Sequence, residues 1–138
     1  MTTALVQTHA KTLVTGDDLN IFAPSFLVAR TGFTVDHPDL TVLFLKTYEQ
    51  VRQYYVSHLD EVTDELVKTK RLEREIVSTV LKNSNPILSP VTPEFAAAHQ
   101  EQADFLYSVG AIKKKLDTSQ TWENQFVEQA LKETSAGK

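Results

Sequence analysis

The pattern of hydrophobic and polar positions divides the chain into a short N-terminal part and a long helical part. From about residue 36 onward, apolar side chains recur every three or four positions, which is the spacing of an amphipathic helix. Before that point the apolar residues come in short runs that are interrupted by Gly16 and Gly32. The pattern predicts successive helices over residues 36–133 and extended segments before them.

The clearest predicted helix begins at Asp36, which can cap it, with Pro38 in its first turn. We expect one side of this helix to face a core, because its members recur at helical spacing: Leu40, Leu43, Phe44, Thr47, Tyr48, Val51, Tyr54 and Tyr55. Polar residues fill the opposite side: Glu49, Gln50, Arg52 and Gln53. The pattern therefore predicts a buried apolar side and an exposed polar side.

Four further helices follow from the same periodicity. They are expected at about residues 60–70, 73–83, 92–110 and 122–133. Thr92, Pro93 and Glu94 form a strong helix start, since they supply a cap, a proline at the first helical position and an acid. Gly110 is expected to end that helix in the left-handed conformation.

Two segments before the helices are candidate strands. Ser25–Ala29 is a nearly continuous apolar run, which is typical of a strand buried on both faces of a parallel sheet. Lys11–Thr15 is a shorter candidate that stops at the turn signal Gly16-Asp17-Asp18. Such a buried strand needs neighbours on both sides, and this chain offers at most one. Part of the sheet is therefore missing or is supplied by another chain.

Composition excludes several classes of function. The chain has 138 residues, a net charge of -4 and no cysteine. Because its cations are scattered, nucleic acid is not expected as a partner, and thiolate chemistry and disulfides are excluded. No pair of the four histidines has helical metal-ligand spacing, and no nucleophile or phosphate-binding motif is present. We therefore expect no enzyme activity, no metal and no cofactor. The N-terminus has no signal-peptide pattern.

Several short motifs occur in a particular order. They are Thr12–Leu19, Ser25–Arg30, His37–Leu40, Val91–Glu94, Gln100–Tyr107 and Ile112–Lys115. This order and spacing resemble the C-terminal portion of the aliphatic sulfonate, taurine and nitrate solute-binding proteins of ABC importers. The sequence departs from that family at its start, where an aromatic-acid pair is absent before Ala4, and at Arg71, where the family has glycine.

The resemblance implies an α/β fragment, predominantly helical, with about five helices plus one or two strands from a type II periplasmic-binding-protein fold. Residues 1–35 would form the end of the second lobe and the hinge crossover, and residues 36–138 the helical C-terminal part of the first lobe. Asn20 and Ser25 would lie at the ligand cleft, where an amide and a hydroxyl can donate to an oxyanion. The other interpretation of these two residues is that they cap turns.

The resemblance also implies partners and a location. These are a small anionic solute, bound weakly or not at all by a chain lacking most of the cleft, an ABC permease, and an extracytoplasmic setting. One alternative stays open from the residues themselves. The chain could be a helical interaction module that binds no solute and self-associates, with a homodimer forming through the exposed strand Ser25–Ala29.

Overall fold

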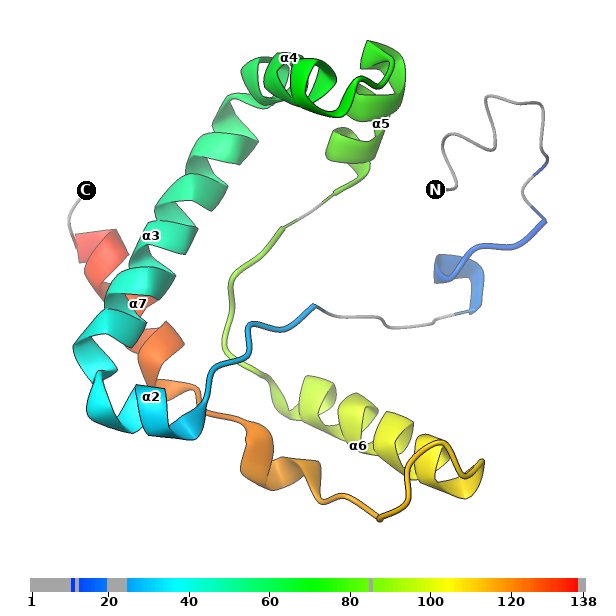
Figure 1. Cartoon of the computed structure of the whole chain (residues 1–138), viewed down its shortest axis with the longest axis vertical. Coiled ribbons are helices and arrows are strands. Elements are labelled where there is room, and N and C mark those ends of the chain that lie inside the picture. The colour runs from blue at the N-terminus through cyan, green and yellow to red at the C-terminus, as the bar shows by residue number, and fades with distance from the viewer. Residues whose placement is uncertain (1–10, 12, 20–24, 85, 137–138) are drawn as a thin grey trace. The chain divides into compact units, whose positions relative to one another are not determined.

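The structure, a computed structural model, describes residues 11, 13–19, 25–84 and 86–136 (Figure 1). Its contacts define two compact units: Met1–Phe26 with Thr47–Ile87, and Leu27–Lys46 with Leu88–Lys138. Over the described residues the regular elements are all helical. They are η1 (Asp17–Leu19), α2 (Thr31–Asp36), α3 (Pro38–Ser57), α4 (Leu59–Lys70), α5 (Arg74–Asn83), α6 (Pro93–Ser108), η2 (Thr118–Thr121) and α7 (Gln125–Ala136).

The prediction of a mainly helical chain is confirmed. Helices α3 to α7 correspond to the five predicted ones, although α7 begins three residues later than expected, so that Trp122 precedes it. The signals at both ends of α6 act as predicted. Thr92 Oγ1 accepts a hydrogen bond from Phe95 N–H at 3.4 Å, and Gly110 adopts φ +74°. Two bonds, Gly110 N–H to Tyr107 O and Ala111 N–H to Leu106 O, complete a Schellman motif.

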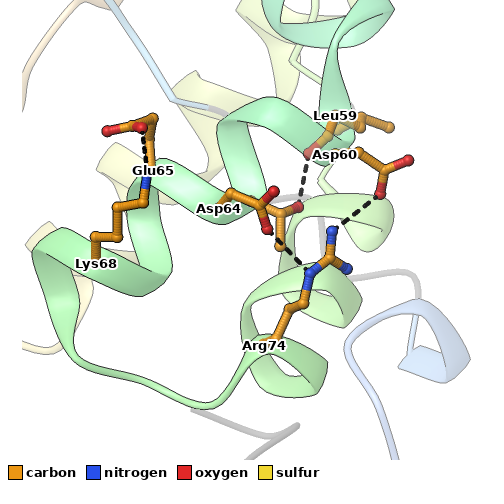
Figure 2. A network of polar contacts seen from close by, with 7 residues as sticks. Leu59, Asp60, Asp64, Glu65, Lys68 and Arg74 are labelled. Atoms are coloured by element: carbon orange, nitrogen blue, oxygen red, sulfur yellow. Dashed lines mark hydrogen bonds and ion pairs between the residues drawn. The ribbon is translucent and has the colours of Figure 1, made fainter.

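Helices α4 and α5 form a hairpin within the first unit (Figure 1). Residues 71–73 link them, and the first of these, Arg71, adopts φ 54° and ψ 39°, the left-handed conformation. Arg74 reaches back from α5 to α4, with Nε 3.0 Å from Asp64 Oδ1 and Nη2 3.4 Å from Asp60 Oδ1 (Figure 2). Both ion pairs are exposed to solvent, so we assign the hairpin's stability mainly to apolar packing around the buried Val77.

The predicted buried strand at Ser25–Ala29 is wrong for this structure. These residues are irregular and exposed, and Val28 is 92% exposed. The second candidate, at Lys11–Thr15, is likewise not a strand over its described residues. The physical reason is the shortage of neighbouring strands that the sequence predicted. A strand is stabilised by hydrogen bonds to neighbouring strands, and none is present in the described part of the chain.

The orientation predicted for α3 is also wrong. Its covered side carries Val42 and Glu49, which are 6% and 4% exposed. Its apolar side is exposed instead, as at Val51, which is 62% exposed. Periodicity identified the two sides of the helix correctly. It could not identify which side this chain covers, because amphipathic spacing describes a helix that has a complete core to face.

Buried apolar side chains are few in the described residues. They are Val42, Val77, Ala103, Val127 and Ala130. A 138-residue domain with a complete core would bury many more large side chains. Within the described ranges, no helix is both long enough and apolar enough to span a bilayer.

Candidate functional site

The two predicted ligand residues lie before α2. Asn20 falls outside the described residues. Ser25 is exposed, in the irregular segment that leads to α2. No residue of the described ranges forms a hydrogen bond with its hydroxyl. That hydroxyl can therefore still donate one bond and accept others. The prediction that Asn20 and Ser25 contact a ligand together stays a prediction.

A closed turn precedes these residues, as the Gly16-Asp17-Asp18 signal predicted. Thr15 N–H and Thr15 Oγ1 both donate to Asp18 Oδ2, at 2.8 and 2.7 Å. Asp18 N–H donates back to Thr15 Oγ1 at 3.2 Å. This reciprocal pattern is that of a capping box, with aspartate in place of glutamate, at the start of η1.

The turn also contains a negatively charged side chain, that of Asp18. The Thr15 hydroxyl, and after it the Thr15 N–H, lower the pKa of the Asp18 carboxyl. Asp18 is therefore ionised at neutral pH, and a carboxylate would repel an anion. Asp18 itself is therefore not a candidate to bind an oxyanion.

Arg52 is a partly buried cation, and each of its three side-chain nitrogens already has a partner. Its Nε and Nη2 contact the two carboxylate oxygens of Glu49 at 2.6 and 2.7 Å, and its Nη1 donates to Pro86 O at 3.2 Å. Glu49 raises the pKa of Arg52. The bond from Nη1 fastens the chain around Pro86 to α3, and the bidentate pair with Glu49 holds the guanidinium in place on the helix.

Two side-chain amides fasten loops in the second unit. Gln100 Oε1 accepts from the N–H and the hydroxyl of Thr118 at 2.9 and 3.0 Å, while Gln100 Nε2 donates to Leu116 O at 2.9 Å. The Asn124 side chain accepts from Val91 N–H and donates to Val91 O, both at 2.9 Å. The sequence analysis missed both amides. Their partners lie 18 and 33 positions away, and no periodic pattern indicates such contacts.

Two of the described histidines pack against aromatic rings. His99 packs with its ring at 4.8 Å from that of Trp122, in an edge-on arrangement. His58 stacks on Tyr54, with ring centroids 4.1 Å apart. Nowhere in the described ranges do three His, Asp or Glu side chains gather in a way that could hold a metal ion.

Comparison with known proteins adds one relative. No family model matches the chain, and no solved structure matches it. A protein of Bacillus subtilis (strain 168), named "Putative aliphatic sulfonates-binding protein", is 38% identical over 128 residues. The alignment covers 93% of this chain and 39% of the relative, so the chain spans about two-fifths of the relative's length. The resemblance to the aliphatic sulfonate-binding proteins that the sequence motifs predicted is thereby confirmed over nearly the whole chain.

Proposed function

We propose that the chain is the C-terminal portion of the solute-binding component of an ABC importer for small anions of the sulfonate, taurine and nitrate type. The observation that carries this proposal is the 38% identity to the Bacillus subtilis relative across 93% of the chain. That relative is named as a binding protein and not as an enzyme. The complete protein would work outside the cytoplasm and deliver its solute to a membrane permease.

In this proposal the complete protein has the two-lobed, type II binding-protein fold. Residues 1–35 form the end of the second lobe and the hinge crossover, and residues 36–138 the helical end of the first lobe. Ser25–Ala29 is then a strand that pairs with strands outside this chain. Its apolar composition and its exposure here support this role, because an apolar segment with exposed backbone gains hydrogen bonds and buried area by joining a sheet.

Asn20 and Ser25 would donate hydrogen bonds to the sulfonate oxygens at the hinge. The uncommitted hydroxyl of Ser25 supports this placement for Ser25. A chain that contains only part of the cleft should bind the sulfonate weakly, since most of the groups that surround the ligand belong to the rest of the complete protein.

Calorimetric titration with ethanesulfonate tests the proposal in a chimaera, in which this chain replaces the matched stretch of the relative. We expect saturable binding, weakened roughly 3- to 10-fold by Ser25→Ala through loss of one hydrogen bond. Ser89→Ala, at another exposed loop serine, is the matched control and should leave affinity unchanged. A folded chimaera that takes up no ethanesulfonate would contradict the proposal.

The alternative function is that of a self-associating module. The exposed apolar residues around Val28 support it. It predicts that the isolated chain forms a dimer in light scattering, that ethanesulfonate does not alter this dimer, and that Val28→Asp disperses it. A monomer over the whole concentration range would exclude this alternative.

A further inference from the structure

We draw no further inference here: the strongest candidate, the surface patch that Lys113, Lys114 and Lys115 form in the loop after α6, is partly neutralised by Asp104, whose Oδ1 lies 3.7 Å from Lys115 Nζ, and nothing in the structure shows what covers it.

Discussion

Arg71 stands where the related proteins are expected to have glycine, and its backbone has φ 54° and ψ 39°. An L-residue in this left-handed conformation costs roughly 1–2 kcal/mol, and glycine relieves that cost while adding freedom to the unfolded chain. We therefore predict that Arg71→Gly stabilises the chain by about 0.5–1 kcal/mol in urea unfolding followed by circular dichroism.

Lys70→Gly provides the control for this prediction. Lys70 is the last residue of α4 and, like Arg71, is exposed. Glycine there should destabilise by up to about 1 kcal/mol, as in other helical positions. If both substitutions destabilised the chain equally, the left-handed geometry at Arg71 would be contradicted.

The Thr15–Asp18 turn gives a prediction about pH. Hydrogen bonds from Thr15 depress the pKa of Asp18 in the folded chain. The turn's contribution to stability is therefore complete at a pH above the pKa of Asp18 in the unfolded chain. It is lost as the pH falls through the lower pKa of Asp18 in the folded chain. By NMR titration, Thr15→Val should raise the pKa of Asp18 toward its ordinary value. Asp117, whose pKa is lowered independently by Ser119, should titrate unchanged; an Asp18 pKa that stays depressed would contradict the turn.

Among the elements, the side chain of Gln100 joins α6 to the loop that follows it. Gln100 accepts from the buried Thr118 and donates to Leu116 O. Gln100→Ala leaves the Thr118 N–H and hydroxyl without their acceptor, which should cost about 1–3 kcal/mol in unfolding free energy. Trp122, the single tryptophan, lies near this loop in sequence and reports on it by fluorescence.

Gln102→Ala is the matched control, because Gln102 is an exposed glutamine on the same helix. Its removal should change the unfolding free energy by no more than about 0.5 kcal/mol. Equal effects at Gln100 and Gln102 would show that the loop is held by other contacts.

Sequence patterns predicted α3 to α7, because the signals of these helices are local, but they did not predict α2 at Thr31–Asp36. Thr92 and Gly110 act at the two ends of α6 as their chemistry requires. The sides of α3 were assigned the wrong way round, because burial depends on what packs against a helix. The Glu49–Arg52 pair lies on α3, but its bond to Pro86 spans 34 positions, and no helical periodicity encodes it.

At the scale of the whole molecule, the family resemblance was predictable from the order of short motifs, whereas the ligand cleft was not. Only Ser25 of the two candidate ligand residues lies in the described ranges, and the chain spans 39% of its relative. A cleft between lobes is made by residues distant in sequence, so the motifs of one portion indicate its place in the protein without defining the solute.

The central claim is that this chain is one portion of a larger binding protein, and that Ser25–Ala29 becomes a strand when the rest is present. Amide hydrogen exchange at Leu27 and Val28 tests it most directly, measured in the isolated chain and in the chimaera. We predict rapid exchange in the isolated chain, where both residues are exposed, and strong protection in the chimaera, where sheet hydrogen bonds form. Rapid exchange in a folded chimaera would contradict the claim.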